Sequence, residues 1–579
     1  MNHENSPNQP SHTLSVAITG SGGSGVVTAG QMLLSAVAKA GFYGLMGRSA
    51  GPQIRGGESA VMLRTGDRPI ECLDDYFEIL IALDWLNVSR FAEEIPLTPE
   101  SLIICDPDSG EIPQAIAGHG ARVMKLPLEA LAKGIDGGRV NMIALGVISD
   151  MLGIPQQAML SVVDAALSRK GDEVINASRR CISCGYAEPK SMQLAGKLPE
   201  ITDPNPRWNI SGNEASGIGA LRGGVRFVAA YPITPATEIL EWLAPNLEKV
   251  GGSLLQAEDE LASINMIIGA SFGGVPSMTA TSGPGLSLMM EGLGLAVTSE
   301  TPVVVANVMR GGPSTGIPTK SEQSDLNIAL YGFHGDAPHL VLGALNIRDC
   351  TFTTEWAVRL AEELQAVAIV LSDQSQGQAR SIIDPPPSAP VRAGRKRAQA
   401  VSRDYLRYSL AEDDGISPMA IPGTEGCLYT ADGLEHNEKG TPSSMHSDHQ
   451  LQLDKRRRKI ANIDTGEHWA EIRGSGDICV ITWGSSSGAA FEAASRLNLL
   501  GKPTRVIAVR LLSPLPETRM RDATNGASRI LTVEQNHGGQ LFHYLHALNL
   551  LPVAARMLAR PGPLPIRPGE ITNTILEWH

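Results

Sequence analysis

The stretch Phe227–Pro245, FVAAYPITPATEILEWLAP, decides how the fold is interpreted. It predicts a short buried strand, a Tyr-Pro corner and a helix, with Thr234 as the N-cap and Pro235 at the first helical position, where a missing N–H costs nothing. A strand that leads into a helix N-terminus gathers free N–H groups, a hydroxyl and the positive end of a dipole. Such a point suits a small anion such as a carboxylate, although a Pro-rich turn that merely starts a helix would have the same sequence.

Size and composition predict several globular α/β domains. The chain has 579 residues, of which 42% are apolar and 19% charged, and its 61 glycines and 4% aromatic content favour tight α/β turns. A net charge of −13 argues against nucleic acid as a partner. Because there is no signal-peptide pattern and no apolar run of membrane-spanning length, we expect a cytoplasmic protein without a membrane partner.

The seven cysteines are few and scattered, which argues against a disulfide framework. Only Cys181 and Cys184 have ligand-like spacing, and they supply two of the four thiolates that zinc or an iron–sulfur cluster takes. A reduced pair on a helix end is the simpler interpretation, so no metal ligand is assigned and the role of the pair stays open.

A Gly-rich turn opens the first domain. Gly20-x-Gly22-x-x-Gly25 lies between a predicted strand and a predicted helix, the context of a dinucleotide fingerprint. The acidic residue expected about 20 positions later is missing. Arg48 and Arg55 lie in the loop that follows, which favours a phosphate-rich ligand over plain NAD. A close-packed turn with solvated arginines is the alternative.

The second domain supplies two further candidates. Glu260 lies in the first turn of a predicted helix, where the dipole favours carboxylates and where solvation is the simplest fate. Arg310 directly follows Pro302–Met309, an uninterrupted apolar strand. Ligands of doubly wound sheets bind at this edge, where an arginine can hold a carboxylate through two hydrogen bonds or pair with a local acid. In the polar loop that follows, Ser314, Thr315 and Lys320 are candidates for a second carboxylate.

Pattern changes divide the chain into α/β domains at 1–190, 211–380 and 471–579, with a linker at 191–210 and a connector or extended excursion over a partner at 381–470. The basic run 455–459, KRRRK, falls near the end of the connector. Its acidic surroundings favour a solvated helix face over a nucleic-acid site.

Three segments resemble the 2-oxoacid:ferredoxin oxidoreductases: 231–235 (YPITP), 279–294 (TATSGPGLSLMMEGLG) and 309–326 (MRGGPSTGIPTKSEQSDL). The resemblance implies an α subunit with a fused N-terminal γ domain. It further implies that 211–380 is a pyrimidine-type domain of thiamine diphosphate enzymes, and that 471–579 is similar to the transketolase C-terminal domain.

The resemblance also implies roles. Glu260 would activate the aminopyrimidine ring of thiamine diphosphate, and Thr234 and Arg310 would bind the substrate carboxylate. The remaining substrate-binding candidates are Tyr231, Ser314 and Thr315. Coenzyme A would be held by the first domain. The residues proposed for it match the family only by their place in a loop: Gly22, Gly23, Gly25, Arg48 and Arg55.

The chain lacks a Gly-Asp-Gly anchor for the diphosphate and a cysteine quartet for a cluster. We therefore expect a separate β subunit that shares thiamine diphosphate with this chain and holds Mg²⁺ and a [4Fe–4S] cluster, in an (αβ)₂ assembly that reduces ferredoxin. The γ–α order and the 311–326 loop resemble the 2-oxoglutarate branch, with pyruvate or a branched-chain 2-oxoacid as alternatives. A non-redox thiamine enzyme and a nucleotide-binding regulatory subunit remain the competing hypotheses.

Overall fold

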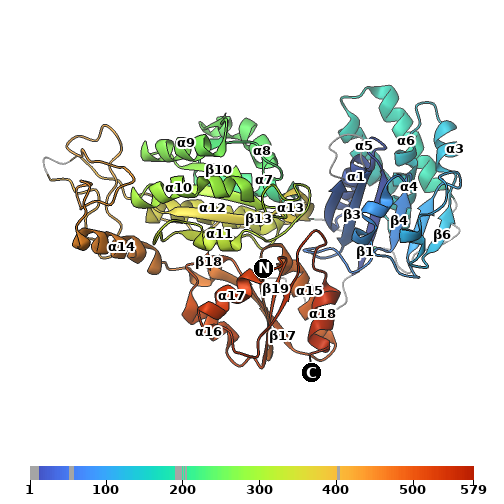
Figure 1. Cartoon of the computed structure of the whole chain (residues 1–579). Coiled ribbons are helices and arrows are strands. Elements are labelled where there is room, and N and C mark those ends of the chain that lie inside the picture. The colour runs from blue at the N-terminus through green and yellow to red at the C-terminus, as the bar shows by residue number, and fades with distance from the viewer. Residues whose placement is uncertain are drawn as a thin grey trace. The chain divides into compact units, whose positions relative to one another are not determined.

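The computed structural model describes residues 12–50, 58–188, 198–199, 201, 205–400 and 404–578. It contains three sheets combined with helices, which confirms the predicted α/β fold class (Figure 1). The described residues form two compact units. The first comprises the residues up to Ser211 together with Gln378–Pro385 and Arg567–Asn573, and the second comprises the remainder.

The first unit is built on an eight-stranded sheet of order β6-β5-β4-β1-β3-β2-β14-β7. Its strands are β1 (Thr13–Ser21), β2 (Tyr43–Ala50), β3 (Glu58–Gly66), β4 (Ile79–Ala82), β5 (Leu102–Cys105), β6 (Arg122–Lys125), β7 (Trp208–Ser211) and β14 (Arg380–Ile383). The strands from β6 to β1 are parallel and the others pair antiparallel. Both β7, from the end of the predicted linker, and β14, which follows the second domain, therefore complete the first sheet.

Helices cover one face of this sheet, and shorter elements cover the other. The helices on the first face are α1 (Val26–Lys39), α3 (Leu128–Lys133), α4 (Val140–Leu152), α5 (Gln156–Leu167) and α6 (Asp172–Ala187), and the short α2 (Gln114–Ala117) lies on the other face. Ile18, Val61 and Ile104 face α1, α4 and α5, whereas the alternate residues Ala17, Ala60 and Ile103 face the short helical turns at Val88–Arg90 and Ala92–Glu94. This alternation is the two-residue period of strands that are buried on both faces.

The second unit contains a seven-stranded sheet of order β18-β12-β13-β11-β10-β8-β9. Its strands are β8 (Phe227–Ala230), β9 (Ser253–Gln256), β10 (Ser277–Thr281), β11 (Val303–Met309), β12 (Leu340–Gly343), β13 (Val367–Asp373) and β18 (Leu511–Ser513). All pair in parallel except β18, which is antiparallel to β12. The helices are α7 (Gly212–Gly223), α8 (Thr237–Leu247), α9 (Glu260–Phe272), α10 (Gly283–Thr298), α11 (Leu326–Tyr331), α12 (Ile347–Leu364) and α13 (Gln374–Gln378).

A five-stranded sheet of order β15-β17-β16-β19-β20 completes the second unit. It consists of β15 (Ala470–Gly474), β16 (Ile478–Trp483), β17 (Thr504–Val509), β19 (Arg529–Glu534) and β20 (Arg556–Ala559), with α15 (Ser487–Leu499), α16 (Glu517–Thr524) and α17 (Gln540–Ala547). The last helix, α18 (Pro568–Leu576), belongs to the first unit up to Asn573. One hydrophobic core contains residues of both sheets. The C-terminal sheet is therefore packed against the seven-stranded sheet within one unit.

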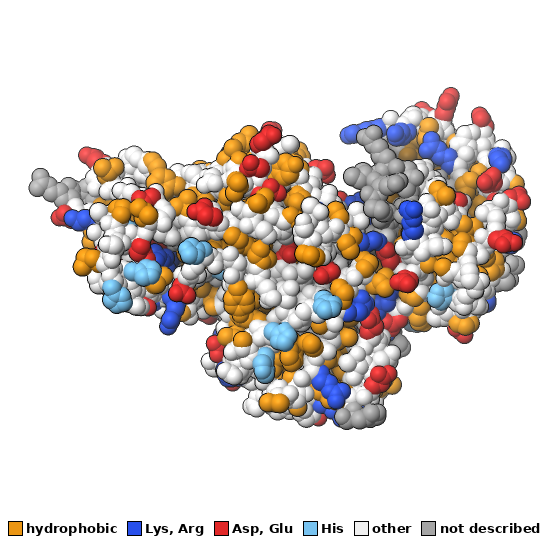
Figure 2. All heavy atoms as spheres, viewed as in Figure 1, with side chains coloured by type: hydrophobic (Ala, Val, Ile, Leu, Met, Phe, Trp, Pro, Cys, Tyr) orange, Lys and Arg blue, Asp and Glu red, His pale blue; other side chains and the backbone are white. Residues whose placement is uncertain are grey.

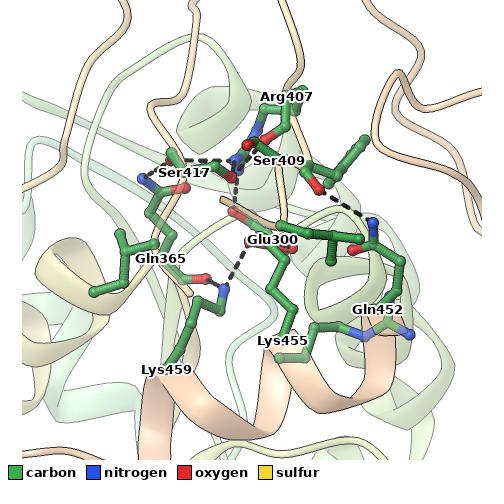
Figure 3. A network of polar contacts seen from close by, with 12 residues as sticks. Glu300, Gln365, Arg407, Ser409, Ser417, Gln452, Lys455 and Lys459 are labelled. Atoms are coloured by element: carbon green, nitrogen blue, oxygen red, sulfur yellow. Dashed lines mark hydrogen bonds and ion pairs between the residues drawn. The ribbon is translucent and has the colours of Figure 1, made fainter. Parts of the chain in front are cut away.

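Between β14 and α14 (His446–Ala461), the described residues form loops with neither helix nor strand (Figure 1), although some of their side chains are buried. Arg407, Tyr408 and Met419 are fully buried. The prediction that the basic run of α14 faces solvent is wrong for Lys455 and Lys459, because both side chains are buried. Their ammonium groups bind the carboxylate of Glu300, at 2.6 and 3.0 Å (Figure 3). None of the helices in the described part of the chain is long and apolar enough to cross a membrane.

Candidate functional site

The turn between β8 and α8 begins the site. The carbonyl of Ile233 accepts hydrogen bonds from Ala236 N and Thr237 N, so a tight turn occupies 234–236 and α8 begins at Thr237 with Ala236 as its N-cap. The prediction that Thr234 caps the helix is therefore wrong. Thr234 lies in the turn with an exposed side chain, at the carboxyl end of β8.

Arg310 leaves the carboxyl end of β11 and turns toward this corner. Its side chain is only 7% exposed, and Nη1 donates a 2.5 Å hydrogen bond to the carbonyl oxygen of Thr234. Burial lowers the pKa of the guanidinium, and the nearby Asp325 carboxylate opposes that shift. The buried Nε has no hydrogen-bond partner among the described residues, so the group retains a donor for a ligand.

Asp325 is the buried acid opposite Arg310, and the sequence did not predict it as a site residue. Its carboxylate accepts a 2.9 Å hydrogen bond from Nδ2 of Asn307, and burial raises its pKa. Although Asp325 is the N-cap of α11, its side chain bonds none of the first amides of that helix. Asn307 could have signalled this site, because it is the one polar residue in β11.

The N-terminus of α10 receives two carboxylates. A side chain at Gly283 would come within 2.8 Å of both carboxylate oxygens of Asp325, and one at Gly285 within 2.8 Å of Cγ and Oε1 of Glu260. The two glycines of the SGPG turn therefore make room for the two acids. The positive end of α10 stabilises negative charge at this place.

Glu260 differs from the two acids that precede it. Glu258 and Asp259 are exposed, and Asp259 caps α9 by accepting a 2.7 Å hydrogen bond from Ala262 N. Glu260 is 7% exposed, and among the described residues no hydrogen bond or ion pair reaches its carboxylate. The structure thus joins Arg310 to Thr234 by a hydrogen bond, and places Glu260 and the Asp325 that faces Arg310 beside the first turn of α10.

Three predicted substrate-binding residues are exposed. Tyr231 is 41% exposed at the β8–α8 corner, and Ser314 and Thr315 lie in the exposed loop between β11 and α11. An isolated bridge between Gly311 and Ile317 closes this loop on itself. Their contact with a substrate stays a prediction.

The Gly-rich turn of the first unit has the expected strand–turn–helix context. Gly25 is the N-cap of α1 with φ 87°, and Gly23, with φ 98°, has no neighbouring atom where a side chain would lie. Gly22 lies in the same turn. Ser21, at the end of β1, donates from both N and Oγ to the Asp84 carboxylate, at 2.9 and 2.8 Å. Asp84 follows β4, which is the neighbour of β1 in the sheet but lies far from the Gly-rich turn in sequence. The sequence pattern therefore did not predict that this acid contacts the turn.

Arg48 lies on β2 at the end of the sheet that carries this turn. The register places Arg48 and Ile18 on either side of Val61, so all three share the face that α1 covers. Its side chain is half-buried. Arg55 lies outside the described residues.

The described residues contain no group of three or more His, Cys, Asp or Glu side chains placed to hold a metal ion. All seven cysteines are free, and Cys181 and Cys184 lie on α6. Burial raises the pKa of both thiols, which keeps them protonated.

Comparison with known proteins identifies the chain. A family model described as "Pyruvate flavodoxin/ferredoxin oxidoreductase, thiamine diP-bdg" matches residues 218–454, and one described as "Pyruvate ferredoxin/flavodoxin oxidoreductase" matches residues 15–188. The first match contains the Thr234–Glu260–Arg310 site, and the second contains the Gly-rich turn.

Whole-chain relatives agree. The 2-oxoacid:ferredoxin oxidoreductase subunit alpha of Saccharolobus solfataricus is 30% identical over 91% of this chain and 92% of its own length. The 2-oxoglutarate synthase subunit KorA of Methanothermobacter marburgensis is 36% identical over 63% of this chain and 98% of its own. A structure of 2-oxoglutarate:ferredoxin oxidoreductase from Magnetococcus marinus is 34% identical with a TM-score of 0.90, and covers 98% of this chain and 100% of the other.

These matches set aside the non-redox thiamine enzyme and the regulatory subunit that the sequence had left open. They confirm the predicted enzyme class, in which ferredoxin accepts the electrons. The chain belongs to the 2-oxoacid:ferredoxin oxidoreductase family, as an α subunit with a fused γ-type domain.

Proposed function

We propose that the second unit binds a 2-oxoacid through its carboxylate at Arg310 and Thr234. The observation that carries this proposal is the buried guanidinium at the carboxyl end of β11, held by the Thr234 carbonyl with Nε still available. A guanidinium in this position can bind a carboxylate with charge-assisted hydrogen bonds, and the Thr234 hydroxyl supplies a further donor. Binding there fixes the carboxylate that is to leave as CO₂ relative to Glu260.

Glu260 is proposed to hold the aminopyrimidine ring of thiamine diphosphate. The cofactor supplies an electron sink for the carbanion that decarboxylation leaves. The site fits such a ring, because Glu260 offers a carboxylate without a partner among the described residues, and the absence of a side chain at Gly285 lets that carboxylate lie against the first turn of α10. With the ring bound, the ionised carboxylate would accept a hydrogen bond from a ring N–H and the protonated carboxyl would donate one to a ring nitrogen, and burial would strengthen that hydrogen bond.

A partner β subunit is proposed to cover the outer face of α9 and α10. Leu261, next to Glu260, is 51% exposed, as is Leu288 of α10, and Gly294 has open space where a side chain would lie. Figure 2 shows further hydrophobic side chains on this part of the second unit. Exposed apolar residues beside a half-formed site favour a second chain that brings the diphosphate anchor, Mg²⁺ and the [4Fe–4S] cluster and delivers electrons to ferredoxin.

Coenzyme A is proposed to bind at the Gly-rich turn of the first unit. Gly23 leaves open space beside the N-terminus of α1, and Arg48 lies on the same sheet face. Backbone N–H groups at a helix N-terminus and an arginine together suit the phosphates of the coenzyme. The related Magnetococcus marinus enzyme has coenzyme A and succinyl-CoA bound in its structure.

2-Oxoglutarate is the proposed substrate. The relatives named for this acid support it, whereas the Saccharolobus solfataricus relative is named only for 2-oxoacids. Pyruvate and branched-chain 2-oxoacids are the alternatives. The complex should therefore be purified with whatever copurifies, and its reduction of methyl viologen compared for the three substrate classes. A best substrate without a second carboxylate would overturn the 2-oxoglutarate assignment alone.

Carboxylate binding is tested by Arg310→Gln. The KM for the 2-oxoacid should rise about 10- to 100-fold, because hydrogen bonds between charged groups contribute about 1.5–3 kcal/mol. Arg226→Gln is the matched control, since Arg226 precedes the amino end of β8 and donates to the Val225 carbonyl. An unchanged KM in the Arg310 variant would show that the carboxylate binds elsewhere.

A further inference from the structure

The C-terminal sheet has its own potential ligand crevice. In the order β15-β17-β16-β19-β20, the chain passes from β16 to β17 on one side and from β19 to β20 on the other. The adjacent carboxyl ends of β16 and β19 therefore form the switch point at which doubly wound sheets bind ligands. From the sequence, no role was assigned to residues 484–488 or to Glu534 in this region, although the family resemblance implies that the domain mostly binds other subunits.

The crevice is filled by a side chain of the same polypeptide. Nε2 of Gln323 donates to the carbonyl oxygen of Trp483, the last residue of β16, at 2.8 Å. Its Oε1 accepts from Gln535 N at 2.7 Å, after β19, and from Ser486 Oγ at 3.2 Å. The side chain is fully buried, and any side chain at Gly484 would collide with Nε2. The crevice is thus built around a carboxamide.

The backbone around Gln323 is held as well. We call Ser321–Asn327 the clamped segment. Gln323 N donates to Gln535 O at 2.7 Å, and Asn536 Nδ2 donates to Gln323 O at 3.2 Å. Gln540 of α17 donates from Nε2 to Ser324 O and accepts from Asn327 N, each at 2.8 Å. Residues at the edge of the C-terminal sheet and on α17 therefore fix the backbone of this segment through hydrogen bonds.

The clamped segment reaches the 2-oxoacid site two residues after Gln323. Asp325 faces Arg310, and Ser324 Oγ donates to the Arg310 carbonyl oxygen at 3.1 Å. A displacement at Gln323 would move the Asp325 carboxylate, and with it the charge that the guanidinium faces.

We propose that Gln323 is a positioning residue, through which the C-terminal sheet sets Asp325 and so orients the Arg310 guanidinium for the 2-oxoacid carboxylate. The inference rests on the proposed role of Arg310. It assigns the third domain a function within this chain, and it places no soluble ligand in the crevice between β16 and β19.

The first test is Gln323→Met, which keeps the length of the side chain and removes its hydrogen bonds. In the purified complex, the KM for the 2-oxoacid should rise about tenfold with a smaller change in kcat and an unchanged KM for coenzyme A. Tyr544→Phe is the matched control, because it removes one buried hydrogen bond, to Leu512 O at 2.7 Å, within the second unit but outside the clamped segment. An unchanged 2-oxoacid KM in a folded Gln323→Met complex overturns the inference.

A double variant separates this inference from the function on which it rests. If Gln323 acts through Arg310, Gln323→Met should add little to the KM of Arg310→Gln, whereas independent effects would multiply. Multiplying effects would overturn the inference and leave carboxylate binding by Arg310 intact. An Arg310→Gln variant with an unchanged KM would instead contradict the proposed function itself.

Gln323→Glu gives a second measurement, the pH dependence of the 2-oxoacid KM, which would not change if Gln323 only filled space. Its protonated form can donate to the Trp483 carbonyl, whereas its ionised form sets a charge against that oxygen. The ratio of its KM to that of the parent should therefore rise with pH. The neighbouring elements carry further charged or titratable groups: Glu322, Asp325, Asp373, Glu534 and His537. These groups are present in both proteins, so dividing the KM of the variant by that of the parent at each pH cancels their effect. A ratio independent of pH would count against the carboxamide contact, including when the methionine variant fails to fold.

Discussion

Glu260 and Asp325 meet the same helix terminus but have different surroundings. Asp325 faces Asn307 and Arg310, so its charge is already used within the chain. No hydrogen bond or ion pair within the described residues reaches Glu260, which leaves that carboxylate available to a ligand. This difference supports the two proposed roles, in which Asp325 positions Arg310 and Glu260 acts on the cofactor.

Replacing Glu260 by glutamine should therefore act on turnover. Removing a carboxylate that exchanges a proton with the cofactor ring is expected to lower kcat about 100-fold or more, while the KM for the 2-oxoacid stays within about threefold. Steady-state reduction of methyl viologen by the complex measures both constants. Glu258→Gln is the control, because Glu258 is exposed just before the same helix; equal losses in the two variants would contradict the assignment.

We expect Asp325→Asn to weaken binding of the 2-oxoacid and to raise the stability of the folded chain. Burial raises the pKa of Asp325 in the folded chain, so ionisation costs stability as pH rises from the unfolded value of about 3.9 through the folded one. The asparagine variant lacks this cost. Its thermal midpoint should exceed that of the parent at pH 8 and approach it as pH falls toward about 4, while its 2-oxoacid KM rises at pH 8. A midpoint difference that grows toward low pH would refute this.

At the scale of single elements, α14 is held by two unusual helix ends. Glu300 follows α10 with φ 51°, and Gln365 is the C-cap of α12 with φ 49°, a conformation that favours glycine. Both side chains are fully buried. Lys459 Nζ donates to the Gln365 carbonyl oxygen at 2.9 Å as well as to Glu300, as Figure 3 shows. Position 300 carries a glutamate rather than a glycine in this conformation, because the glutamate carboxylate anchors α14.

The two lysines of α14 should respond differently to replacement. Lys455→Met removes the ammonium that contacts both oxygens of Glu300, at 2.6 and 2.7 Å, and should destabilise the second unit by about 3 kcal/mol. Burial lowers the pKa of both lysines, that of Lys459 to about 7. Lys459→Met should cost less at neutral pH, because Lys459 contacts only one oxygen of Glu300, at 3.0 Å. Amide hydrogen exchange along α14 would rank the two variants, and an equal increase in exchange would contradict the assignment.

The same lysine predicts a pH effect of known sign. The unfolded chain binds a proton at Lys459 up to about pH 10.4, whereas the folded chain releases it near pH 7. The contribution of Lys459 to stability therefore rises between these values. The unfolding midpoint of the parent should increase more from pH 7 to pH 9 than that of Lys459→Met, and parallel changes would show that Lys459 is not the titrating group.

Local patterns predicted those parts of the site that depend on neighbours in sequence. The apolar run before Arg310 indicated a buried parallel strand and thereby located the guanidinium at its carboxyl end. The start of α8 was misplaced, because the Ile233 carbonyl draws 234–236 into a turn. Contacts such as Gln323 with Gln535, or Lys455 with Glu300, join residues 212 and 155 positions apart, and no local pattern encodes them.

At the scale of the whole molecule, the first sheet depends on a strand from far along the chain. β14 lies between β2 and β7, and Ile382 pairs with Gly44 on one side and Asn209 on the other. An isolated domain ending near residue 190 would lack both added strands and expose the β2 edge. The two units are therefore not independent modules joined by linkers.

Ile382→Pro should consequently open the first unit selectively. Proline cannot donate to a ladder and is excluded from central strands. Limited proteolysis should then cut within residues 12–188 faster than in the parent, while the KM for the 2-oxoacid holds. Proline at Val391, which is 90% exposed and outside any strand, is the control. Equal protection of the first unit in both variants would show that β14 is dispensable.

The late origin of β14 also constrains synthesis. While the ribosome is still translating the second α/β domain, β2 remains an open template with unpaired amides, the kind of edge on which nascent chains aggregate. Only after residue 383 has left the exit tunnel can the N-terminal sheet close. A pause or a chaperone during that interval would favour correct assembly, and splitting the gene just after the first domain would remove the strand that closes it.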